Sequence, residues 1–121
     1  MKQFTELTGA ELDIAVALAL GASKTKTAMD NAIACGVPLR YREPMFAVVN
    51  AAGIAVMWRP TVDWYQGGPL LTNLLELGFM IMQPPEMPVA VIKEAWRIEG
   101  ADVLEAVCRT VVAMAQTKES A

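Results

Sequence analysis

Short apolar runs separated by turn-forming residues occupy the middle of this chain and set its fold class. Met45–Val49 and Ile54–Trp58 are rich in residues with high β propensity, and Asn50 and Gly53 lie between them. Two such runs that flank a turn signal predict a β-hairpin. The linker before them, residues 37–44, contains a proline near each end and has room for a short edge strand.

The same pattern returns later in the chain. Phe79–Gln83 and Val89–Ile98 are apolar runs joined through Pro84 and Pro85. We expect a second hairpin whose second arm is the whole of Val89–Ile98. Apolar and polar residues alternate in the second half of this arm, and only Glu94 breaks the alternation.

Helix signals lie near both ends of the chain. Near the N-terminus, Thr8 and Glu11 have the spacing of a capping box, apolar residues follow at helical spacing, and Gly21 can end the helix. Near the C-terminus, Asp102 and Glu105 repeat the start signal before a broad apolar stripe. We therefore predict a helix at each end.

Another helix is predicted directly after the first. Ser23 or Thr25 can cap it, and Gly36 can end it. Met29 and Ile33, together with two alanines, would form its apolar face.

Helices outside two hairpins predict an α+β fold, with helices packed on an antiparallel sheet built from the two hairpins. The chain has 121 residues, which is enough for one domain that spans residues 1–121. Hydrophobic residues make up 55% of the chain and the mean hydropathy is +0.36. This excess of apolar surface predicts burial against a second copy, in a homodimer.

Charge and hydropathy exclude two classes of partner. The net charge is −3 and the ten basic residues are scattered, which argues against duplex DNA. The apolar run Ile14–Ala22 follows three acidic residues and is shorter than the roughly 18 residues of a membrane span. We therefore expect neither a signal peptide nor a membrane segment there.

Residue types that serve catalysis or metal binding are scarce. The chain has no histidine, and neither of its two serines lies in a nucleophile motif. Glu11 and Asp13 form only a local carboxylate pair, which we expect to be solvated. Cys35 and Cys108 give either two buried free thiols or a disulfide, and they cannot make a zinc spacing. The composition disfavours an enzyme and predicts no metal or cofactor.

The stretch RPTVDWYQGGPLL, Arg59–Leu71, is the strongest candidate for a site. Pro69 follows Gly67 and Gly68, which predicts a helix that begins at the proline. The backbone N–H groups of both glycines would then lie at the helix start, where an anion such as a nucleotide phosphate is favoured. In the alternative interpretation the glycines only permit a sharp turn, which Asp63 braces.

Aromatic side chains surround this stretch. Trp58, Trp64 and Tyr65 lie beside Asp63 and Gln66, a composition typical of a surface that contacts a partner. We expect one of the three aromatics to face outward, although Trp64 could instead be a core plug under the loop. Two hypotheses follow: a protein-binding surface, or a small-molecule or nucleotide site at the Gly-Gly-Pro turn.

Three segments resemble the phage NinX-like family of small phage and prophage proteins. Leu7–Gly21 is similar to the family's Ala-rich opening helix, and Leu104–Ala113 is similar to its closing helix. Pro60–Leu71 is similar to the central signature, an Asp-Trp pair followed by Gly-Gly-Pro and an aliphatic pair; Thr72 and Asn73 then depart from a frequent Glu-Arg. The resemblance implies a bacterial cytoplasmic protein encoded by a phage or prophage, but no chemistry. Together with the composition, it predicts a non-enzymatic protein that binds a host or phage protein.

Overall fold

The computed structural model describes the backbone of residues 3–120 and the side chains of residues 3–117. Within this range the chain forms four α-helices, one short 3-10 helix and six strands. The elements are, in chain order, η1 (Phe4–Glu6), α1 (Gly9–Leu20), α2 (Ala28–Cys35), β1 (Leu39–Arg42), β2 (Met45–Val49), β3 (Ala55–Met57), α3 (Trp64–Glu76), β4 (Met80–Met82), β5 (Val89–Lys93), β6 (Trp96–Gly100) and α4 (Val103–Ser120). The predicted α+β class is confirmed.

The first hairpin forms as predicted and gains the expected edge strand. β1, β2 and β3 pair in this order, all antiparallel, with Val48 opposite Val56. The side chain of Asn50 closes the turn between β2 and β3, because its Oδ1 accepts the N–H groups of Ala52 at 3.0 Å and Ile54 at 2.9 Å. The turn residue seen in the sequence therefore has a direct physical role.

The second hairpin differs from the prediction in its second arm. Val89–Ile98 is not one strand: β5 ends at Lys93, the chain turns at Glu94 and Ala95, and β6 begins at Trp96. Glu94 has a positive φ of 54°, a conformation that strands do not adopt. The break in the alternation of apolar and polar residues at Glu94 therefore indicates a turn, and the prediction of one continuous strand is wrong. The sheet order is β4-β5-β6, again antiparallel.

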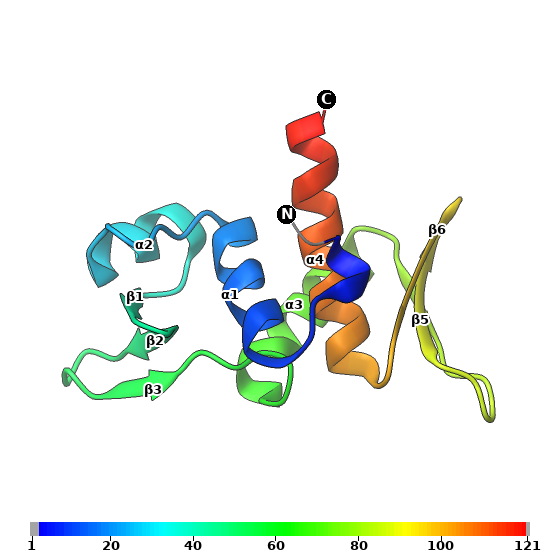
Figure 1. Ribbon diagram of the computed structural model, residues 1–121, viewed down its shortest axis with the longest axis horizontal. Helices are drawn as coiled ribbons and strands as arrows, with labels where there is room; N and C mark the ends of the chain where they lie inside the picture. The colour runs from blue at the N-terminus through cyan, green and yellow to red at the C-terminus, as the bar shows by residue number, and fades with distance from the viewer. Residues whose placement is uncertain (1–2, 121) are drawn as a thin grey trace.

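The two hairpins belong to separate three-stranded sheets, and α1, α3 and α4 lie between these sheets (Figure 1). On one flank of α4, Cys108 and Val112 join the core that α1, β1 and β2 form. On the other flank, Ala106 and Val107 join the core that α3 and β5 form. α4 therefore connects the two cores, which explains why its apolar stripe is broad.

The two terminal helices start at the predicted residues. At α4, Asp102 Oδ1 accepts the N–H of Glu105 at 2.8 Å, and Glu105 Oε1 accepts the N–H of Ala101 at 3.0 Å. At α1, Thr8 occupies the N-cap position without a side-chain capping bond, and Gly21 ends the helix with a φ of 109°. Among the helices in the described range, none has the length and hydropathy to cross a membrane.

α2 begins later than predicted. Its N-cap is Thr27, whose Oγ1 accepts the N–H of Asp30 at 3.1 Å; Ser23 and Thr25 lie before the helix. Only the predicted end, at Gly36, is confirmed.

The predicted apolar face of α2 is wrong. Met29 and Ile33 are 74% and 80% exposed, whereas Asn31 is fully buried. The Asn31 amide accepts the N–H of Ser23 at 2.9 Å and donates to the carbonyls of Ser23 and Leu39. A fully hydrogen-bonded amide can be buried at low cost, so Asn31 attaches α2 to β1 through hydrogen bonds.

Candidate functional site

α3 begins five residues earlier than predicted. Asp63 is its N-cap, and the Asp63 Oδ1 accepts the N–H of Tyr65 at 2.9 Å. Pro69 lies inside the helix, so the prediction of a helix that begins at the proline is wrong. Because proline has no N–H, the carbonyl of Tyr65, four residues earlier, receives no helical hydrogen bond from it.

The two glycines consequently lie within α3. The N–H of Gly67 donates to the carbonyl of Asp63 at 2.8 Å, so it is not free to bind an anion. A Cβ atom on Gly67 would stand 2.5 Å from the Pro60 carbonyl oxygen and 2.6 Å from Leu104 Cδ2, whereas one on Gly68 would meet open space. Gly67 therefore permits close packing of α3, and the geometry assumed for a Gly-Gly-Pro anion site does not occur.

Gln66 joins the start of α3 to the end of β3. Its Oε1 accepts the N–H of Arg59, and its Nε2 donates to the carbonyl of Met57 at 2.9 Å. Both polar atoms of the side chain are thus bonded to the backbone of the same chain. Gln66 and the capping residue Asp63 therefore stabilise the backbone conformation between the end of β3 and the first turn of α3.

The three aromatic residues divide into one core residue and two surface residues. Trp58 is 2% exposed, and its Nε1 donates to the backbone carbonyl of Asp13 at 3.0 Å. Trp64 and Tyr65, the first two residues of α3, are 56% and 94% exposed. Trp64 is therefore not a core plug, and two aromatics face outward where we expected one.

A groove beside Tyr65 brings together four of the seven predicted site residues. It has a volume of about 460 Å³ and lies between the first sheet and the start of α3. Its lining consists of Val37, Val48, Val56, Trp58, Asp63, Tyr65, Gln66, Pro69 and Leu70. Trp64, Gly67 and Gly68 are not part of this lining. We call this feature the α3 groove.

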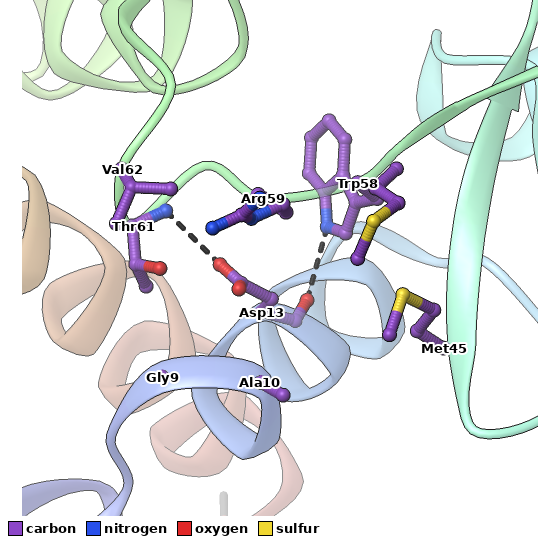
Figure 2. A pocket seen from close by; sticks show the side chains of 9 residues that line it. Gly9, Ala10, Asp13, Met45, Trp58, Arg59, Thr61 and Val62 are labelled. Atoms are coloured by element: carbon purple, nitrogen blue, oxygen red, sulfur yellow. Dashed lines mark hydrogen bonds between the residues drawn. The ribbon is translucent and has the colours of Figure 1, made fainter.

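A second cavity, which the sequence reasoning missed, lies on the opposite face of β3. Val56 lines the α3 groove and Met57 lines this cavity, because successive residues of a strand point to opposite faces. The cavity has a volume of about 290 Å³. Its lining consists of Gly9, Ala10, Asp13, Met45, Met57, Trp58, Arg59, Thr61 and Val62 (Figure 2). We call it the Asp13 cavity.

Asp13 is buried, contrary to the solvated carboxylate expected from the sequence. Only 6% of the residue is exposed, and its Oδ1 accepts the N–H of Thr61 at 3.0 Å. Burial raises the pKa of Asp13, and hydrogen bonding from Thr61 and the positive charge of Arg59 oppose this rise only in part. The ionised carboxylate is therefore incompletely stabilised by the protein.

Both cysteines are free thiols, so the alternative of a disulfide is wrong. Burial raises the pKa of the Cys108 thiol well above its ordinary value, so it is a poor nucleophile near neutral pH. The half-buried Cys35 thiol lies against the backbone carbonyls of Asn31 and Val37. In the part of the chain that the structure describes, no cluster of Cys, Asp or Glu side chains could hold a metal ion.

Comparison with known proteins supports the family resemblance seen in the sequence. The family model described as "Bacteriophage P22, NinX" matches residues 3–115 of the 121. This range contains the three segments that carried the resemblance, together with the α3 groove and the Asp13 cavity. A search of curated proteins found no match.

Proposed function

The chain belongs to the NinX family of bacteriophage proteins, and we propose that this phage-derived protein acts in the bacterial cytoplasm by binding a host or phage protein. A non-enzymatic role is part of the proposal. It is supported by the lack of histidine and by the buried, weakly nucleophilic Cys108 thiol. The side chains of Asp63 and Gln66 are engaged with the backbone, which favours a structural over a catalytic role for them.

The exposure of Trp64 and Tyr65 is the observation that carries this proposal. Two large aromatic side chains occupy the first turn of α3, and neither is needed to fill the core. Trp and Tyr are enriched at the centres of protein interfaces because each buries a large area and loses few rotamers on binding. Such residues on a rigid helix start are well placed to serve as contact anchors.

The α3 groove makes this surface concave next to the exposed aromatic side chains. Tyr65 stands at the groove, and aliphatic side chains such as Val48, Val56 and Leu70 form much of its lining. An apolar side chain of a partner could enter the groove beside Tyr65, while Trp64 contacts the partner outside the groove. We call Trp64 together with the α3 groove, whose lining includes Val56 and Tyr65, the binding surface. A photoreactive group at position 65 tests whether a partner contacts it.

A separate apolar surface suits the proposed homodimer. Leu75 and Leu77 at the end of α3 and Met80 and Met82 on β4 are exposed. Met80 and Met82 lie on one face of β4, opposite to Ile81, which packs against the second core. Homodimer interfaces are more apolar than other protein surfaces. We call these four residues the dimer surface.

We expect wild-type protein to sediment as a dimer at tens of micromolar, a concentration of the order at which modest interfaces assemble. Met80→Glu should shift it to monomer, because two carboxylates would meet across the dimer surface or lose hydration there. Tyr65→Ala is the matched control, since it alters only the binding surface, and should remain a dimer. A wild-type monomer would refute the proposed dimer, and a Met80→Glu variant that still forms dimers would refute the proposed dimer surface.

A further inference from the structure

The Asp13 cavity has no part in the proposed function, yet opposite charges line it without pairing. Asp13 and Arg59 both contribute to its wall. The charge of Arg59 acts on the Asp13 carboxylate, but no ion pair between them is formed among the described residues. Figure 2 shows the Asp13, Arg59 and Thr61 side chains turned toward the same space. A ligand that carries one positive and one negative group could form an ion pair with Asp13 and another with Arg59.

The negative side of the cavity is built to accept hydrogen bonds. The Asp13 carboxylate is nine-tenths buried and receives the backbone N–H of Thr61 through Oδ1. A buried carboxylate without a cation is costly, and an ammonium group bound beside it would remove most of that cost.

The Thr61 hydroxyl is the second polar group that faces this space. Thr61 is 7% exposed, and its Oγ1 is buried without a hydrogen-bond partner. The hydroxyl lies close enough to the Asp13 carboxylate to oppose the rise in the pKa of Asp13, although Oγ1 has no hydrogen-bond partner within normal distance. Buried polar atoms are nearly always paired, so this hydroxyl beside a cavity has room for a further partner. An ammonium group has three donors and could satisfy Asp13 and Thr61 together.

The rest of the cavity is apolar, with the thioether side chains of Met45 and Met57 and the indole of Trp58. The Trp58 ring is held in place by its hydrogen bond to the Asp13 carbonyl. Methionine side chains adapt to ligands of irregular shape. These walls would accommodate a short aliphatic group.

We infer that the Asp13 cavity binds a small zwitterion with an apolar side chain, of the class of apolar α-amino acids. The ammonium group would lie on Asp13 and Thr61, the carboxylate on Arg59, and the side chain against Met45 and Met57. The volume of about 290 Å³ lies at the small end of ligand sites and suits a ligand of this size.

Calorimetric titration of the wild-type protein with L-leucine, N-acetyl-L-leucine and L-leucinamide tests this inference. L-leucine should bind with a Kd of about 1 mM or tighter. This affinity requires only a modest binding free energy from each non-hydrogen atom of the ligand. N-acetyl-L-leucine lacks the ammonium group and L-leucinamide lacks the carboxylate, so each should bind at least about tenfold more weakly. Absence of L-leucine binding at about 10 mM, or equal binding of all three, would overturn the inference.

Two variants test the roles of Arg59 and Thr61 separately. Arg59→Gln removes an exposed guanidinium and should reduce L-leucine affinity to that of L-leucinamide. Thr61→Val removes the hydroxyl and keeps the shape of the side chain; it should weaken L-leucine binding about fivefold to tenfold while the protein still unfolds in one transition in urea. A Thr61→Val protein with unchanged affinity, or an Arg59→Gln protein that still prefers L-leucine to L-leucinamide, would overturn the assignment.

Discussion

Replacing Trp58 by Ala is expected to lower the free energy of unfolding by about 3–5 kcal/mol, the loss typical of a fully buried large aromatic. Trp58 is a member of the first core and separates the α3 groove from the Asp13 cavity. The substitution would open a void between them and leave the backbone carbonyl of Asp13 without its indole donor. Urea unfolding followed by far-UV circular dichroism measures the loss.

Trp64→Ala is the matched control, since it removes the same side chain six residues later. Trp64 is half exposed at the start of α3, so we expect a loss below about 1 kcal/mol. Equal losses for the two variants would contradict the division into a core tryptophan and a surface tryptophan.

The second large effect is expected at Gly67, where Ala should cost about 3 kcal/mol. The added methyl would collide with the Pro60 carbonyl oxygen and with Leu104, and moving the former requires a backbone shift. This loss should exceed the gain of about 0.5–1 kcal/mol that Ala normally brings to a helix interior. Thermal unfolding of purified Gly67→Ala protein gives the net change.

Gly68→Ala provides the comparison within the same helix turn. A Cβ atom there meets no neighbour, so only the helix-propensity gain of about 0.5–1 kcal/mol remains. The two substitutions should therefore have opposite signs. Stabilisation by both would show that α3 does not pack against Pro60 as closely as described.

Local signals predicted much of the fold, because their physics involves neighbours in sequence. The turn at Asn50 and the start of α4 at Asp102 depend on side-chain bonds within four residues, and both were predicted. The turn at Glu94 is equally local, but its break in alternation was interpreted as an imperfect strand. The chain forms two sheets because the two flanks of α4 belong to different cores. No pattern among neighbouring residues in the sequence indicates this arrangement.

The candidate site was harder to predict because it depends on distant contacts. Asp13 lies among apolar residues on α1, and its burial depends on Thr61, forty-eight residues later. Asn31 is buried for the same kind of reason, through its bond to Leu39. The start of α3 was misplaced because Pro69 after two glycines suggested a first turn, whereas the cap is Asp63. The exposure of Trp64 and Tyr65 follows from that earlier start.

Site-specific photocrosslinking from position 65 tests the central claim, that the protein works by binding another protein through the binding surface. Tyr65 is nearly fully exposed, so a photoreactive phenylalanine derivative can replace it without loss of packing. We predict a discrete crosslinked adduct in bacteria infected with a phage that carries the modified gene, lost when Trp64→Ala is added. Glu86, an exposed residue between β4 and β5, is the control position and should yield none. No adduct from position 65, or the same adducts from both positions, would contradict the account.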